Sequence, residues 1–480
     1  MKRKSLTKNY IYNSLYQVFA ILIPLLTTPY IARILKPENV GINSYVNSVV
    51  TLFTTIGLMG LSNYSVREVA YVRGDQQKLN KVFSELLILR LIYFVFTIFV
   101  YLIYAHFSSY SLYYYIYIFT IIGAFFDVAW LFQGLEELGI TILRSFIIKL
   151  VGMICIFVFV RKESDLEILM LIYSLTTIFS AITLYIPTKK IITKLELKNL
   201  EIIKHVIPNL KLFLPQVATL IYCQFDKIMI NDLSMDIKQV GFYNQAEKIV
   251  KVPLAVVTSL SAVMLPRISE EYIKNNSDNV KKYIISAFKV SLALSIPLSI
   301  GLAAISYGLI PWFLGNEYID TAYILIALGI TTIFISISNV SGAQYLTAIN
   351  NTKVLTVSYF CGAGINVILN FIFIPKYKAL GATIGTIAAE LLVALIQIVY
   401  MKKIIKLREL IKISKNYIIA SILMCLVCSS MYFILKPSII LTSIQICIGG
   451  AVYFFMLYIF KDETFEKYGK KILKKVGGKI

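Results

Sequence analysis

Two lysines close together in an apolar stretch are the residues best placed to do chemistry. Lys248 and Lys251 lie within the apolar segment 241–264, and Asn244 precedes them at helical spacing. If the segment is a helix, the three side chains share one face, and the lysines lie roughly 10 and 15 Å along the axis from Gly241. Two like charges repel in a medium of low dielectric, so they require a water-filled cavity or an anionic ligand. The pattern therefore predicts an anion site.

Three further ionisable residues belong to the same prediction. Asp226 and Lys227 lie in the apolar segment 212–231, and Asp226 can neutralise one of the two lysines if the segments touch. Arg33 lies at the end of the segment 11–33, where it either lines the path of a ligand or anchors the helix. We expect Asp226, Lys227 and Arg33 to contribute to one substrate cavity together with the lysine face.

The remaining charges inside apolar segments suggest other roles. Asp127 and Arg144 lie at similar depth if segments 112–132 and 141–160 form an antiparallel hairpin, which predicts a structural ion pair. Glu390 is an acceptor for Lys149 or for a coupling cation. We expect Arg90 and Lys289 to extend along their helices to the headgroup region, because long side chains near a helix end do so. These last two are therefore interpreted as membrane anchors.

The elements that position these residues follow from composition. Of the 480 residues, 58% are hydrophobic and 15% charged, with a mean hydropathy of +0.75. Apolar segments long enough to cross roughly 30 Å of hydrocarbon recur about fourteen times, and lipid offers backbone groups no partners except in a helix. No alternation of period two supports a β-barrel. The predicted spans are 11–33, 41–61, 83–105, 112–132, 141–160, 168–187, 212–231, 241–264, 284–307, 320–341, 354–374, 380–400, 417–435 and 439–460.

Charge sets the expected orientation. The N-terminus, the connections at 61–83, 187–211 and 400–417 and the tail after 460 are basic, and the intervening connections are not. The positive-inside rule then places both termini in the cytoplasm of a multi-pass plasma-membrane protein. The net charge of +21 is thereby explained as a topology signal that also meets anionic headgroups, so we expect no nucleic-acid partner.

Metal and redox chemistry have few candidate residues. The chain has two histidines, His106 and His205, and six cysteines that all lie in apolar segments. Cys425 and Cys428 form a CxxC on a helix without an acidic or histidine neighbour, which does not indicate a metal ligand set. We expect no metal and no cofactor.

An internal repeat predicts two lobes. Gly41 and Arg67 are separated by 26 positions, as are Gly241 and Arg267, and each glycine follows a valine. Duplicated halves are common in transporters. The predicted organisation is an N-terminal six-helix lobe at 1–187, a basic linker at 188–211, a second six-helix lobe at 212–400 and two further helices with a basic tail at 401–480.

Several longer strings resemble one membrane-protein family. The strings are PLLTTPYIARIL, LMGLSNYSVREVA, DVAWLFQGLEE, FLPQVATLIYCQFDKIMI, VGFYNQAEKIVKVP, MLPRISEEY, GAGINVILNFIFIP and LGATIGTIAAE, and they span nearly the whole chain. As a set they resemble the Wzx-type polysaccharide-biosynthesis flippases, which belong to the superfamily of the multidrug and toxin extruders (MATE). The resemblance implies an all-α integral membrane fold of two pseudo-symmetric lobes.

The resemblance also implies a function. Such proteins exchange inward-facing and outward-facing states and move an undecaprenyl-pyrophosphate-linked oligosaccharide, a unit of O-antigen, capsule or another surface polysaccharide, to the outer leaflet. The implied partners are this lipid, the surrounding membrane lipids and other polysaccharide-assembly proteins. The driving force stays open, with an H⁺ or Na⁺ gradient as the candidate.

Three alternatives remain. A multidrug exporter of the same fold needs carboxylates for cationic drugs, whereas lysines predominate at membrane depth here. A peptidoglycan-precursor flippase is disfavoured because those proteins carry an Arg-Asp pair where this chain has Thr27 and Thr28. A membrane glycosyltransferase or polymerase needs an acidic dyad or a large loop that holds a base, and no connection supplies either.

Overall fold

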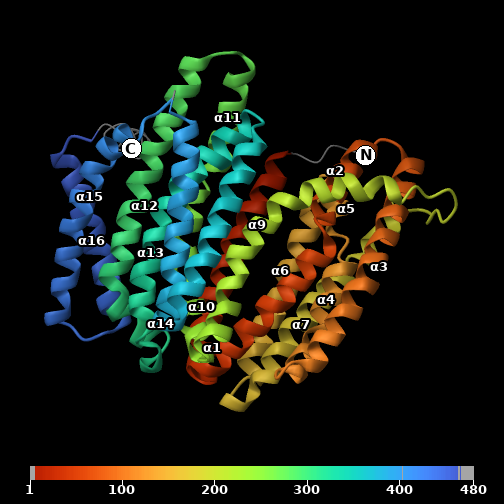
Figure 1. Ribbon diagram of the computed structural model, residues 1–480, viewed down its shortest axis with the longest axis horizontal. Coiled ribbons are helices and arrows are strands. Elements are labelled where there is room, and N and C mark those ends of the chain that lie inside the picture. Colours follow the sequence, from red (N-terminus) through yellow and green to blue (C-terminus); the bar gives the residue numbers. More distant parts are fainter. Residues whose placement is uncertain (1–5, 403, 463–464, 466–480) are drawn as a thin grey trace, which may run out of the picture. The chain divides into compact units, whose positions relative to one another are not determined.

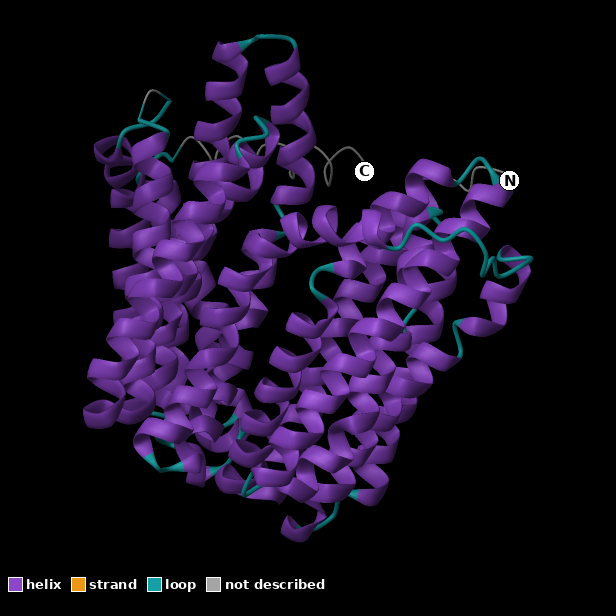
Figure 2. Cartoon of the chain, turned by 45° about the vertical axis from the view of Figure 1, so that its right-hand side comes forward, coloured by secondary structure: helices purple, strands orange, loops and turns teal. Residues whose placement is uncertain are grey.

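Helices joined by loops make up the part of the chain that the structure describes (Figures 1 and 2). The computed structural model describes residues 6–402, 404–462 and 465, and within these residues it contains no strand. The basic residues 1–5 and most of the basic tail, on which part of the predicted orientation rests, lie outside the described residues. The chain divides into two compact units between Ile228 and Met229, inside the helix α9.

The first unit is built from α1 to α8 and the first part of α9. One buried apolar cluster joins α2, α3 and α5 and includes Leu61, Phe83 and Trp130. The elements are α1 (Leu6–Leu58), α2 (Leu61–Val72), α3 (Gln76–Phe107), α4 (Ser111–Phe126), α5 (Ala129–Gly134), α6 (Leu138–Phe159), η1 (Glu163–Asp165), α7 (Leu166–Ile182), α8 (Tyr185–Ile191) and α9 (Ile203–Ser234).

The second unit is centred on α12, against which α13, α15 and α16 pack. Phe288, Tyr417 and Tyr453 form part of its buried apolar cluster, so the last two helices belong to this unit. The elements after α9 are α10 (Ile237–Thr258), α11 (Ser261–Ile273), α12 (Ser277–Phe313), η2 (Asn316–Tyr318), α13 (Thr321–Ser338), η3 (Asn339–Leu346), α14 (Thr352–Tyr400), α15 (Leu407–Ser430), η4 (Met431–Phe433) and α16 (Ile439–Ile459).

Membrane-crossing helices dominate the described chain. Among the described residues, 11 helical stretches are long and apolar enough to cross a bilayer. Two of them, α1 and α14, each contain two predicted spans joined across a break, at Lys36 and Lys378. The break at Lys36 has a local cause, since the next residue is Pro37 and the residue before a proline is disfavoured in helix. The all-helical membrane class is confirmed, and the count of fourteen crossings stays a prediction.

The internal repeat extends to the helix boundaries. In the first unit a helix ends at Leu58 and the next begins at Leu61, and in the second unit the equivalent boundaries are Thr258 and Ser261. Both pairs differ by 200 positions (258 − 58 and 261 − 61). The same shift relates the predicted Gly-to-Arg motifs, so in each unit the helix that contains the glycine is followed, after two residues, by a short helix that contains the arginine.

Candidate functional site

The lysine face lies on an unbroken helical segment. Asn244, Lys248 and Lys251 all fall within α10, whose backbone is helical from Ile237 to Thr258, so the spacing of four and three places them on one side. Exposure increases along this side, because Asn244 is buried, Lys248 is half-buried and the Lys251 side chain is 61% exposed. The Lys251 amine pairs with the Glu247 carboxylate at 2.8 Å. The most exposed amine is therefore held by a carboxylate of its own helix.

The other residues predicted for the cavity differ in burial. Asp226 and Lys227 are both buried in α9, at the end of the first unit, and Arg33 is exposed on α1. Glu390 is buried in α14 of the second unit. Each of the four takes part in electrostatic or hydrogen-bond interactions. A shared cavity that contains them stays a prediction.

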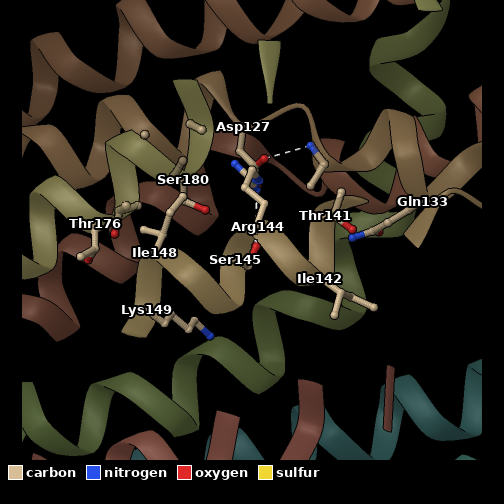
Figure 3. A pocket seen from close by; sticks show the side chains of 15 residues that line it. Asp127, Gln133, Thr141, Ile142, Arg144, Ser145, Ile148, Lys149, Thr176 and Ser180 are labelled. Carbon is tan, nitrogen blue, oxygen red and sulfur yellow. Dashed lines mark hydrogen bonds between the residues drawn. The ribbon is translucent and has the colours of Figure 1, made fainter. Parts of the chain in front are cut away.

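Asp127 and Arg144 line one cavity of the first unit, with a volume of about 510 Å³ (Figure 3). One Asp127 carboxylate oxygen accepts a hydrogen bond from the backbone N–H of Ala129 at 2.9 Å. The Arg144 guanidinium donates to the hydroxyls of Thr183 at 2.8 Å and Ser145 at 3.4 Å. Asp127 and Arg144 therefore lie in the same region, as the predicted hairpin requires. The direct ion pair between them stays a prediction.

Arg90 corrects one prediction. Its side chain does not extend to the headgroup region, because the residue is only 2% exposed. The guanidinium donates to the Asp127 carbonyl at 3.0 Å, to the Phe125 carbonyl at 3.3 Å and to the Ser62 hydroxyl at 3.1 Å. The two carbonyl acceptors are available because α4 ends at Phe126 and leaves its last carbonyls unsatisfied, and a cation stabilises such a helix end.

A buried polar cluster in the first unit escaped the sequence reasoning. Glu85 is 0% and His205 1% exposed, and the His205 Nε2 lies 2.9 Å from the Glu85 carboxylate. The Tyr64 hydroxyl lies 2.7 Å from the His205 Nδ1. The Glu201 backbone N–H donates to Glu85 at 2.8 Å, and the Lys204 amine lies 3.2 Å from the same carboxylate. In the sequence, the one local sign of this cluster is that Glu85 lies in an apolar stretch.

Lys204 and the carboxylates of this cluster stabilise one another in their charged forms. The hydrogen bond and charge of Lys204 hold the pKa of Glu201 below its usual range. Burial would lower the pKa of Lys204, but its hydrogen bonds to Glu201 and Glu85 outweigh burial and raise that pKa. The residues at the start of α9 are thereby attached to α3. Among the described residues no group of three or more His, Cys, Asp or Glu side chains could hold a metal ion.

Amide and hydroxyl side chains connect the helices of the second unit. The Gln397 carbonyl accepts from the Ser341 hydroxyl at 2.7 Å, and its amide donates to the Ser358 hydroxyl at 3.0 Å. Gln344 lies in η3, a stretch of π-helix, and donates to the hydroxyl of Ser261 at 3.2 Å. Asn366 accepts from Asn370 at 3.3 Å. Gln344 and Asn366 are therefore fixed by side chains of their own unit.

Comparison with known proteins identifies the class. The model of the polysaccharide biosynthesis protein family matches residues 6–271, more than half of the chain, and the MatE model matches residues 212–372. A protein of Shigella dysenteriae described as "Putative O-antigen transporter" is 26% identical over 80% of this chain and 96% of its own length. A protein of Escherichia coli K12 with the same description is 23% identical over 83% of this chain and 97% of its own length.

Solved structures share the fold. The lipid II flippase MurJ in an inward closed conformation aligns with a TM-score of 0.72 at 19% identity, covering 94% of this chain and 98% of MurJ. An inward-facing MATE-family multidrug resistance transporter aligns with a TM-score of 0.62 at 13% identity, covering 83% of this chain and 96% of its own. The similarity to these relatives, together with the apolar helices, defines the chain as a multi-pass membrane transporter.

The chain belongs to the polysaccharide biosynthesis protein family. The resemblance to the polysaccharide-biosynthesis flippases and the predicted MATE-like fold are thereby confirmed.

Proposed function

We propose that this transporter moves an undecaprenyl-pyrophosphate-linked oligosaccharide from the inner to the outer leaflet of the plasma membrane by alternating access. The observation that carries the proposal is the similarity to two O-antigen transporters along nearly their whole length. The oligosaccharide is a repeat unit of O-antigen, capsule or another surface polysaccharide. Such a substrate has an anionic diphosphate between a lipid tail and a sugar chain, so it requires cations inside a membrane protein.

The lysine face of α10 meets that requirement. An amine inside a predicted span is costly unless it is hydrated or paired, and Lys251 is paired with a carboxylate on its own helix. A diphosphate can displace or join this pair, because charge-assisted hydrogen bonds to phosphate are strong. Lys248, Asn244, Lys227, Asp226 and Arg33 complete the proposed substrate cavity. This arrangement favours an anion over the cationic drugs of multidrug exporters.

The energy source is proposed to be an H⁺ or Na⁺ gradient. Glu390 is buried in α14, and a buried carboxylate in a membrane helix is a default candidate for a coupling role. Both termini are proposed to be cytoplasmic, as the basic connections indicate. The proposed partners are the lipid-linked oligosaccharide and other polysaccharide-assembly proteins.

The test reconstitutes the full chain in vesicles that carry the lipid-linked oligosaccharide, and follows its exposure to an impermeant glycan-cleaving enzyme. Wild-type protein should make glycan of the opposite leaflet accessible. Lys251→Ala should abolish this transport while the melting temperature changes little, because the Lys251 side chain is 61% exposed and an exposed ion pair within one helix contributes less than about 1 kcal/mol.

Lys274→Ala is the matched control. Lys274 also pairs with a carboxylate four residues earlier and its side chain is 58% exposed, but it lies at the end of α11, outside the predicted spans. This variant should transport at the wild-type rate. No transport by the wild type would refute the proposed function, and full activity of Lys251→Ala would remove that lysine from the site.

A further inference from the structure

The cavity of the first unit is built by a helix with two unlike faces. Along one side of α6, the side chains Leu143, Ile147, Val151, Ile154 and Val158 are all exposed and apolar. The opposite side carries the residues that line the cavity, among them Thr141, Ser145 and Ile148. A membrane helix with an apolar outer side and a polar inner side separates acyl chains from a polar interior.

Close helix contacts bound the cavity. A Cβ at Gly123 of α4 would lie 2.9 Å from the backbone of α7 at Ile178, and a Cβ at Gly152 of α6 would lie 2.6 Å from Thr176 of α7. The two glycines therefore allow α7 to pack against both neighbours. Thr176 and Gly123 themselves line the cavity, so part of its wall is formed where these helices pack closely.

The lining suits an anion. The lining includes two cationic side chains, Arg144 and Lys149, and one carboxylate, Asp127, so cations are in excess. Its hydroxyl-bearing residues are Thr141, Ser145, Thr176, Thr177 and Ser180. In Figure 3 the Lys149 amine points away from Arg144, so Arg144 is the cation at the centre of this polar group. Figure 3 shows Arg144 beside Asp127, with Ser145, Ser180 and Thr141 around them. The hydroxyls of Thr183 and Ser145 orient the Arg144 guanidinium. A planar guanidinium with nearby hydroxyls is a common arrangement for binding phosphate.

We propose that this cavity binds the phosphate head of a membrane lipid. Its volume of about 510 Å³ lies within the range of small-ligand sites, roughly 300 to 1,000 Å³. In the predicted orientation the connection 132–141 is cytoplasmic, which places Asp127 and Arg144 at the inner leaflet. The lipid is either the diphosphate-bearing carrier of the substrate, in which case the inference rests on the proposed function, or a resident anionic phospholipid.

The experiment measures lipid binding to the purified full chain by native mass spectrometry, with two probes tested separately, undecaprenyl diphosphate and phosphatidylglycerol. Arg144→Gln should weaken binding of at least one probe tenfold or more. Arg144→Lys retains the charge without the planar fork and should weaken it less. Arg161→Gln is the matched control, because Arg161 is an exposed arginine directly after the other end of α6 and should bind as the wild type does.

The binding results for Arg144→Gln show which of the two lipids the cavity holds. Loss of undecaprenyl diphosphate binding alone identifies the carrier, and loss of phosphatidylglycerol binding alone identifies a resident phospholipid. Equal affinity of wild type and a folded Arg144→Gln for both probes would overturn the inference. The vesicle transport assay distinguishes this failure from failure of the proposed function, because wild-type transport would then persist.

Discussion

Removal of the Glu85 carboxylate should destabilise the first unit more than any removal of an exposed charge nearby. Glu85→Ala deletes the acceptor of hydrogen bonds from His205 at 2.9 Å and from the backbone N–H of Glu201 at 2.8 Å, and it removes the carboxylate that pairs with the Lys204 amine at 3.2 Å. Because the Glu85 side chain is fully buried, water cannot readily take the place of its carboxylate. Hydrogen bonds to a charged group contribute about 1.5 to 3 kcal/mol each, and breaking a buried charge pair costs about 3 to 5 kcal/mol.

We therefore expect a loss of about 3 to 5 kcal/mol. A unit of roughly 150 to 250 residues loses about 2 to 4 °C of melting temperature per kcal/mol, which gives a decrease of about 6 to 20 °C. The assay heats the full chain in detergent to a series of temperatures and measures the folded fraction that remains by size-exclusion chromatography. Glu85→Gln should lie between the wild type and Glu85→Ala, because His205 can exchange its ring proton and accept from the glutamine amide.

Glu201→Ala is the matched control. The Glu201 side chain belongs to the same cluster and contacts Lys204 at 2.9 Å, but it is 62% exposed. Its removal should cost less than about 1 kcal/mol because exposed ion pairs are screened, and the backbone N–H that binds Glu85 remains. A melting temperature of Glu85→Ala within 2 °C of the wild type (about 1 kcal/mol by the same conversion), or an equal loss in Glu201→Ala, would refute the reasoning.

Two other perturbations test the second unit. Gly381→Ala should lower the melting temperature by the equivalent of about 1 to 3 kcal/mol, because its Cβ would overlap the Phe373 carbonyl. Gly364→Ala is the control and should be neutral, because a Cβ there meets nothing within 4 Å. Equal effects of the two substitutions would argue against this packing. Burial would raise the pKa of Asp236, but the hydrogen bond and charge of Lys378 outweigh burial and lower it. The contribution of the Asp236–Lys378 ion pair to the stability of the fold is therefore complete above the unfolded-state pKa of about 3.9. It disappears as the pH falls through the lower pKa that Asp236 has in the folded state. The stability difference between wild type and Asp236→Asn should be constant from pH 8 to pH 5 and shrink below about pH 4; a difference that shrinks already near neutral pH would exclude this ion pair as its cause.

The sequence determined the class of this protein because the class depends on local composition and spacing. Apolar segments long enough to cross a bilayer can be read directly from the chain, as can the proline that accompanies the break in α1. The shift of 200 positions between the two units is present in the sequence as the Gly-to-Arg motif, and the helix boundaries share it. The same local logic placed Asn244, Lys248 and Lys251 on one helical face.

Only the tertiary structure decided which polar groups meet. Glu85 and His205 are 120 positions apart and Tyr64 and His205 are 141 apart, and no periodicity within one helix specifies such partners. Arg90 shows the same limit, because its depth in the helix suggested contact with headgroups, whereas the end of α4 supplies carbonyl acceptors that keep it buried. The partner of a charge in a membrane protein depends on which helices pack side by side, and that choice is made by the summed packing of many side chains.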